Sequence, residues 1–232
     1  MSTDDDPRSG RYLRTALVTG GLGRVGEAIA RRLEGEGWSV FAAGRADGDV
    51  SRPQEARALV ERAARELGRL DLLVNAAGEG FAPKAVEELT EEDWDAAFGA
   101  TAKGSFFVTQ AAASHLRVAR GCVVMIEDVA AYRPWPSFAA HSAAKAAQAM
   151  LTRVLARALA PEVRVCGVAP GPVAVERGQE DRRAAETLLG RVGSPDDVAA
   201  AVSFLADADF ITGTTLFVDG GRSLQTGFPP GP

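Results

Sequence analysis

Short apolar runs alternate along this chain with longer segments whose apolar residues recur at helical spacing. The runs predicted as strands are 15–19, 39–43, 71–75, 122–126, 164–168 and 215–218, and the predicted helices are 25–34, 53–67, 91–116, 138–159, 180–189 and 195–205. Continuous apolar runs are typical of parallel strands that are covered on both faces. We therefore expect one α/β domain with a Rossmann-type, doubly wound parallel sheet, whose ligands bind at the carboxyl ends of the strands.

The segment after the second predicted strand is unusually short. Only Ala46, Asp47 and Gly48 separate Arg45 from Asp49. A parallel β-α-β crossover needs a dozen or more residues. The sheet is therefore predicted to be shortened after its second strand and to hold six strands, unless residues 48–51 form a short extra edge strand.

Composition limits the kinds of partner the chain can have. With 232 residues, 46% apolar and 25% charged, it suits a single domain with a sizeable core, expected at residues 12–224 between disordered tails at 1–11 and 225–232. The net charge of -5 argues against a nucleic-acid surface, and the absence of a long apolar run argues against a membrane span. Cys122 and Cys166 are expected to be buried thiols in a reducing compartment, and no transition-metal site is predicted.

A glycine-rich turn follows the first predicted strand and opens a helix. Its glycines are Gly20, Gly23 and Gly26, and Leu22, Arg24 and Val25 lie between them. A strand, a glycine turn and a helix N-terminus together form a cradle for pyrophosphate. The turn therefore predicts a nucleotide site, the alternative being a glycine-rich turn without a ligand.

Two arginines bear on which nucleotide is bound. Arg24 lies within the turn, and Arg45 follows the second predicted strand. An acidic residue at the second position would hold the ribose of NAD, whereas an arginine pairs with the 2′-phosphate of NADP. We therefore predict NADP(H); the alternative is that Arg45 is a solvated loop residue, and Asp47 is the nearest acid that would argue for NAD.

The segment from His141 to Lys145 carries a titratable pair. Residues four apart in a helix lie on the same face, so both side chains are expected to project together. Histidine exchanges protons near neutral pH, which makes His141 a candidate proton donor.

With these residues in place, the chain resembles the short-chain dehydrogenase/reductase family over nearly its whole length. The resemblance rests on six segments, at residues 19–26, 49–50, 73–78, 141–145, 170–172 and 218–221. It implies a cytoplasmic homodimer or homotetramer that moves hydride between a nicotinamide and the carbon of a small molecule. It also implies further cofactor-binding residues: Asp49, Val50, Asn75, Ala76, Ala77, Gly78, Lys145, Pro170, Gly171 and Val173.

Within that family the chain is similar to bacterial pteridine reductases. These proteins also carry an arginine in the glycine turn, here Arg24, and an aspartate thirteen residues before the usual tyrosine, here Asp128. The resemblance implies a pterin-like or other small carbonyl substrate. Trp135, between two prolines, is a candidate for stacking on a flat substrate, and Glu176 and Arg177 occupy the usual position of the lid.

The chain departs from the family pattern at most of its catalytic positions. His141 stands where the family has its tyrosine, Asp128 replaces the usual serine, and Thr101 replaces the asparagine of the proton relay. Ala76 replaces the second asparagine of an Asn-Asn-Ala-Gly stretch, and Lys145 is retained. One hypothesis is a reductase with a rebuilt Asp128, His141 and Lys145 relay. The other is a catalytically silent NADP(H)-binding protein that acts as a sensor or as a subunit of a hetero-oligomer.

Overall fold

A computed structural model describes residues 13–78, 80, 82–173, 175 and 177–225. Six parallel strands form one sheet in the order β2-β1-β3-β4-β5-β6. The strands are β1 (Thr15–Thr19), β2 (Ser39–Ala43), β3 (Leu72–Asn75), β4 (Cys122–Ile126), β5 (Arg164–Pro170) and β6 (Thr215–Val218). This confirms the predicted doubly wound α/β fold with six strands. The predicted tails at 1–11 and 225–232 lie outside the described residues, apart from Gln225.

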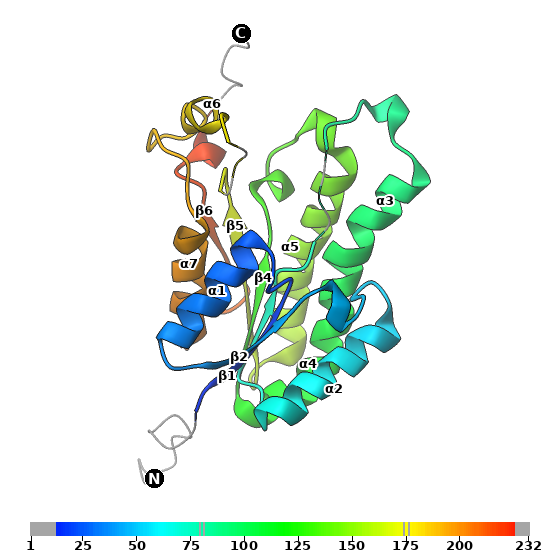
Figure 1. Cartoon of the computed structure of the whole chain (residues 1–232), viewed down its shortest axis with the longest axis vertical. Helices are drawn as coiled ribbons and strands as arrows, with labels where there is room; N and C mark the ends of the chain where they lie inside the picture. The colour runs from blue at the N-terminus through cyan, green and yellow to red at the C-terminus, as the bar shows by residue number, and fades with distance from the viewer. Residues whose placement is uncertain (1–12, 79, 81, 174, 176, 226–232) are drawn as a thin grey trace.

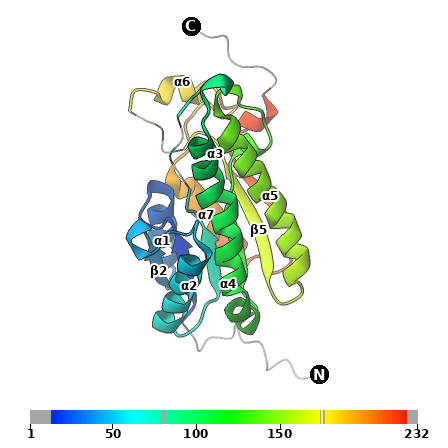
Figure 2. The ribbon, with the colours of Figure 1, turned by 90° about the vertical axis from the view of Figure 1, so that its right-hand side faces the viewer.

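Helices cover the sheet on both sides and make three layers (Figure 1). On one side α1 (Arg24–Gly35) packs against α7 (Pro195–Asp207), and on the other α2 (Pro53–Leu67), α4 (Gly104–Ala119) and α5 (Ala139–Leu159) lie together. Figure 2 shows α3 (Glu91–Phe98) and α6 (Glu180–Ala184) beyond one end of this sandwich. The loops at that end carry the candidate site.

The strand sequences explain the layers. Side chains of successive strand residues point to opposite faces, so Leu17 and Leu73 enter the core beneath α2 and α4, while Ala16 and Leu72 enter the core beneath α1 and α7. All four side chains are fully buried. Strands covered on both faces need apolar residues at every position, which is why the runs show no alternation. Cys122 and Cys166 are buried free thiols in this sheet.

Two local differences from the predicted elements concern the end where the site lies. The predicted helix 91–116 is broken by a π-helical turn, Gly99–Lys103, between α3 and α4. The predicted helix 180–189 ends at Ala184, where the hydroxyl of Thr187 donates to the carbonyl oxygen of Ala184. The predicted shortening after the second strand is confirmed, because between β2 and α2 the chain forms only a short 3₁₀ turn, Arg45–Asp47, and no further strand, among the residues described.

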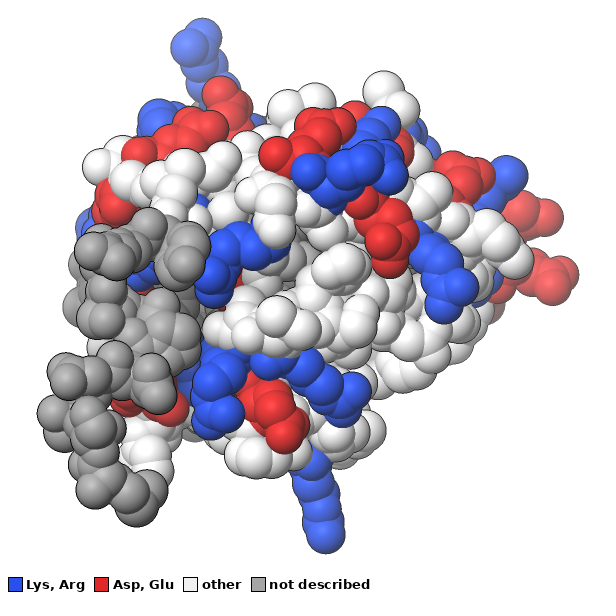
Figure 3. Space-filling model, turned by 90° about the horizontal axis from the view of Figure 1, so that it is seen from below, with Lys and Arg blue, Asp and Glu red and all other residues white. Residues whose placement is uncertain are grey.

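Charges of both signs are mixed on the face seen from the amino ends of the strands. Figure 3 shows lysines and arginines beside aspartates and glutamates there, without a continuous area of one sign. None of the described helices is long and apolar enough to cross a membrane.

Candidate active site

The register of the sheet brings the predicted cofactor segments together. Thr19, the last residue of β1, lies opposite Ala43 of β2 and Asn75 of β3. The glycine turn, the loop after β2 and residues 76–78 therefore all begin at one edge of the sheet. This is the edge at which open parallel sheets bind their ligands.

The glycine turn is shaped by contacts that leave no room for side chains. Gly20 has a φ of +66°, and a Cβ there would lie 2.7 Å from the carbonyl oxygen of Ala76 and 2.8 Å from the backbone nitrogen of Ala77. A Cβ on Gly26 would lie 2.1 Å from the carbonyl oxygen of Gly20. Gly23 precedes the first residue of α1, with Leu22 exposed and Val25 half-buried beside it. The turn thus presents bare backbone and a helix N-terminus, which is the arrangement that binds pyrophosphate.

Arg24 and Arg45 are both exposed at this edge. Arg24 also reaches across the site, because its guanidinium donates to the carbonyl oxygen of Val175 at 3.5 Å. Asp47, the acid that could have favoured NAD, accepts hydrogen bonds from Arg62 and from the backbone of Gly44, each at 2.8 Å. The nearest acid is therefore engaged within the protein, and both arginines are exposed at the same edge of the sheet.

The remaining cofactor-binding candidates border the same edge. The side chain of Asp49 accepts from the backbone of Ser51 at 2.9 Å, and hydrogen bonding to Ser51 holds the pKa of this carboxyl below its usual range. Val50 is buried against the start of α4. Pro170 ends β5, and Gly171 packs so closely on Asp219 that a Cβ there would lie 2.7 Å from its Cα. Gly78 is exposed and Val173 half-buried beyond these strand ends. The residues present fit a dinucleotide, with the bare turn as its phosphate cradle.

A row of polar residues lies on the buried face of α5. His141, Lys145, Gln148 and Thr152 are each no more than 9% exposed. Their spacing of three and four residues keeps them on one side of the helix, facing β4 and β5. Such a row is costly to bury, so each member needs partners.

His141 and Asp128 are brought together as predicted. The Nε2 atom of His141 lies 3.5 Å from Oδ2 of Asp128. The other carboxylate oxygen of Asp128 accepts from the backbone nitrogen of Ala130 at 2.7 Å, which fixes the carboxylate at the start of a short 3₁₀ turn. A carboxylate held in this way can orient the imidazole.

Lys145 is anchored one helical turn farther on. Its ammonium donates to the carbonyl oxygen of Ile126 at 2.7 Å and to the side-chain oxygen of Gln148 at 3.0 Å. Burial lowers the pKa of this ammonium from its usual range, while the charges of Asp128 and Glu127 act in the opposite direction. Gln148 in turn donates to the hydroxyl of Ser105 at 2.7 Å, which links α5 to α4.

Glu127, which the sequence analysis did not single out, lies at the centre of a buried network. Its carboxylate accepts from the hydroxyls of Thr152 and Tyr132, each at 2.6 Å, and from Thr215 at 3.1 Å. Burial and the contact with Glu127 raise the pKa of Tyr132 to about 12. Gly167 leaves the space that this side chain needs, since a Cβ there would lie 2.1 Å from Oε1 of Glu127. A signal was present in the sequence, because an acid directly after a buried strand needs buried partners.

The network fixes the backbone that contacts Lys145 and His141. Ile126 supplies the acceptor for Lys145, and Asp128 contacts His141. Glu127 lies between these two residues and is tied to α5 and β6 through its hydroxyl partners. The contacts with Lys145 and His141 therefore both come from one segment of three residues, 126–128, which the network holds in place.

Trp135 lies close to this site but already has partners. The guanidinium of Arg222 lies 4.6 Å from the centre of its ring, and the ring of Phe138 is 5.7 Å away. Arg222 also pairs with Glu186 at 2.6 Å. One face of the indole is therefore covered within the protein. Of the predicted lid residues, Arg177 is exposed and Glu176 lies outside the described residues.

Comparison with known proteins identifies the family of this chain. Residues 27–223 match a family described as enoyl-(acyl carrier protein) reductase. The chain is 36% identical to 3beta-hydroxysteroid dehydrogenase 1 of Eggerthella lenta, over 93% of this chain and 95% of that protein. The chain belongs to the short-chain dehydrogenase/reductase family. Members of this short-chain family are oxidoreductases that use a nicotinamide cofactor.

Solved structures of short-chain dehydrogenase/reductases agree with this assignment. A protein from Burkholderia xenovorans described as one of them superposes with a TM-score of 0.87 at 27% identity, covering 93% of this chain and all of that one. The 3-ketoacyl-(acyl-carrier-protein) reductase of Brucella melitensis, solved with NADH, gives a TM-score of 0.84 at 29% identity, covering 90% and 98% of the two chains. The fold and the oxidoreductase class follow from these similarities, whereas the choice of cofactor and substrate has to come from this chain's own residues.

Proposed function

We propose that this short-chain oxidoreductase is an NADP(H)-dependent reductase of a small carbonyl or pterin-like substrate, with His141 as its proton donor. The observation that carries the proposal is the 3.5 Å contact between His141 and Asp128, one helical turn from Lys145. A carboxylate this close to the imidazole supports a role for His141 as a general acid that Asp128 orients. It supports a rebuilt relay in place of the tyrosine and serine to which the family resemblance points.

The proposed roles follow from the contacts. The nicotinamide would supply the hydride when bound. His141 would donate a proton to the substrate oxygen, and Asp128 would orient the imidazole for this transfer. Lys145, with its ammonium fixed on Ile126 and Gln148, would hold the nicotinamide ribose. The backbone of the glycine turn, with Arg24 and Arg45, would bind the phosphates.

The second candidate is a catalytically silent NADP(H)-binding protein. The residues that replace the family's usual catalytic residues favour it. Thr101 lacks an amide, and an imidazole at position 141 is shorter than the phenol it replaces. A panel of small aldehydes, ketones and pterins with NADPH separates the two candidates. Loss of NADPH absorbance that depends on one of these compounds supports the reductase, and tight NADPH binding without turnover of any of them supports the silent protein.

We also infer a homodimer or homotetramer built on α4 and α5. The largest apolar side chains exposed on these helices are Val118, Met150 and Val154, which are 90%, 53% and 52% exposed. Exposed apolar surface of this kind is typical of an interface. Light scattering at micromolar concentration is expected to give twice or four times the mass of the chain, and a monomer would contradict the inference.

A further inference from the structure

A cavity of about 200 Å³ lies beside His141. It is lined by Gly80, Ala82, Lys84, Leu89, Asp93, Ala96, Ala97, Thr101, Ser137, Phe138, Ala139, Ala140 and His141. Of the predicted catalytic and cofactor-binding residues, only His141 contributes to this wall. The cavity therefore adjoins the proton donor but is separate from the predicted cofactor site.

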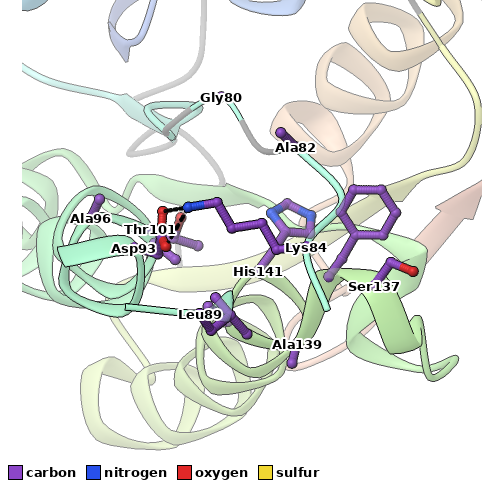
Figure 4. Close-up of a pocket in the computed structure, with 13 residues that line it drawn as sticks. Gly80, Ala82, Lys84, Leu89, Asp93, Ala96, Thr101, Ser137, Ala139 and His141 are labelled. Atoms are coloured by element: carbon purple, nitrogen blue, oxygen red, sulfur yellow. Dashed lines mark hydrogen bonds and ion pairs between the residues drawn. The ribbon is translucent and has the colours of Figure 1, made fainter. Parts of the chain in front are cut away.

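The wall is mostly carbon and carries balanced charge. Leu89, Phe138 and the neighbouring alanines supply apolar surface. Lys84 crosses the cavity to Asp93 (Figure 4), with its ammonium 2.7 Å and 2.5 Å from the two carboxylate oxygens. These two charges neutralise each other, so a charged ligand group would find no partner of opposite sign without breaking the pair.

A π-helical turn between α3 and α4 contributes to the wall of this cavity. Thr101, only 3% exposed, lies in the π-helical turn Gly99–Lys103, and its side chain forms part of the cavity wall. Single π-helical turns inside α-helices occur frequently at functional sites. The turn is an observation independent of the volume, and it indicates that the space between α3 and α5 is used.

We propose that this cavity receives the apolar substituent on the carbonyl carbon of the substrate, an uncharged group up to the size of one benzene ring. The proposal rests on the reductase function proposed above. An apolar cavity of about 150 Å³ is enough to bind benzene, so a volume of about 200 Å³ accepts one ring with little to spare. A pterin has two fused rings with polar edges, which this largely carbon wall would leave without partners. Aryl and short branched alkyl carbonyls therefore fit better than pterins.

The first test compares three aldehydes with NADPH: acetaldehyde, benzaldehyde and 2-naphthaldehyde. We expect kcat/KM to rise at least tenfold from acetaldehyde to benzaldehyde and to fall again for 2-naphthaldehyde. Ala97→Leu and, as a second variant, Ala139→Leu fill the cavity and are expected to lower kcat/KM for benzaldehyde tenfold or more, with acetaldehyde changed less than threefold. Ala58→Leu, on the exposed face of α2, is the matched control and should change neither. Equal losses for both aldehydes in both filled variants would overturn the proposal.

The second test measures binding of an apolar ring in the cavity without turnover. The chain has two histidines, His115 and His141, so the ring protons of each are resolved by NMR. Toluene is expected to shift the signals of His141 and not those of His115, which lies on α4 and contacts Glu61 of α2. Ala97→Leu should abolish the shift. If toluene shifts His141 while no aldehyde is reduced, the cavity assignment holds and the reductase function fails; if toluene causes no shift, the cavity assignment fails.

Discussion

The glycine turn and the buried face of α5 meet at the same edge of the sheet, but opposite features of the sequence determine their structures. At the turn the decisive feature is missing side chains, since a Cβ on Gly20 or Gly26 would lie within 2.7 Å of backbone oxygen. On α5 the decisive feature is a set of polar side chains held by named partners, such as Lys145 on Ile126 and Thr152 on Glu127. A backbone shape depends on several residues together, so it is lost when one of them is substituted. A polar side chain, in contrast, can be replaced by another polar side chain if its hydrogen-bond partners are kept. This difference fits the presence of the glycine turn beside His141 and Asp128, which stand where the family resemblance points to tyrosine and serine.

The largest effect on cofactor binding is expected from Gly26→Ala. The added methyl group would lie 2.1 Å from the carbonyl oxygen of Gly20, and overpacking of this kind costs about 1–3 kcal/mol in the free energy of unfolding. The turn would also have to open, so NADPH affinity measured by fluorescence titration should fall roughly 100-fold, equivalent to about 2.7 kcal/mol.

Gly35→Ala is the matched control within the same helix. A Cβ at this position meets nothing within 4 Å, and alanine favours a helix over glycine by up to about 1 kcal/mol. Stability should hold or rise and NADPH affinity should stay unchanged. If Gly26→Ala changes stability and NADPH affinity no more than Gly35→Ala does, the absence of a side chain at Gly26 does not determine the structure of the turn.

A smaller effect is expected from Glu127→Gln. The amide nitrogen cannot accept from the hydroxyls of Tyr132 and Thr215, and leaving a buried polar group without its partner costs about 1–3 kcal/mol. Because Glu127 clamps the segment that carries Asp128, turnover should fall roughly tenfold while NADPH affinity changes less than twofold. Glu66→Gln, on an exposed part of α2, should leave both unchanged. A loss of stability with unaltered turnover would show that the network only supports the fold.

The smallest effect is expected from Arg45→Asp, which changes an exposed side chain at the cofactor edge. Loss of one phosphate contact should weaken NADPH binding about tenfold, or about 1.4 kcal/mol, with NADH binding changed less than threefold. Arg57→Asp, exposed on α2, controls for the change in net charge. Equal binding of NADPH and NADH by the wild-type protein would remove the assignment to NADP(H).

The strands and the cofactor segments could be predicted because each depends on a local pattern. Continuous apolar runs define β1 and β4 to the residue, and the glycine spacing marks the start of α1. Gly99 and Thr101 are poor helix formers that mark a weak point in the helix, but they do not distinguish a π-helical turn from an α-helical one, so the π-helical turn at Gly99–Lys103 could not be predicted. Glu127 is visible as an acid after a strand, but its partners Tyr132, Thr152 and Thr215 lie 5, 25 and 88 residues away. Only the folded chain brings them together.

The measurement that tests the account most directly is the turnover of His141→Ala set beside its NADPH affinity. His141 contacts Asp128 at 3.5 Å and lies outside the glycine turn, so it should contribute to proton transfer and little to cofactor binding. Positioned general acids contribute roughly 10²–10⁴-fold. We predict that kcat on a reducible carbonyl falls at least 100-fold while the Kd for NADPH stays within twofold. Unchanged turnover on the same compound would show that the proton comes from elsewhere and would contradict the proposed role of His141.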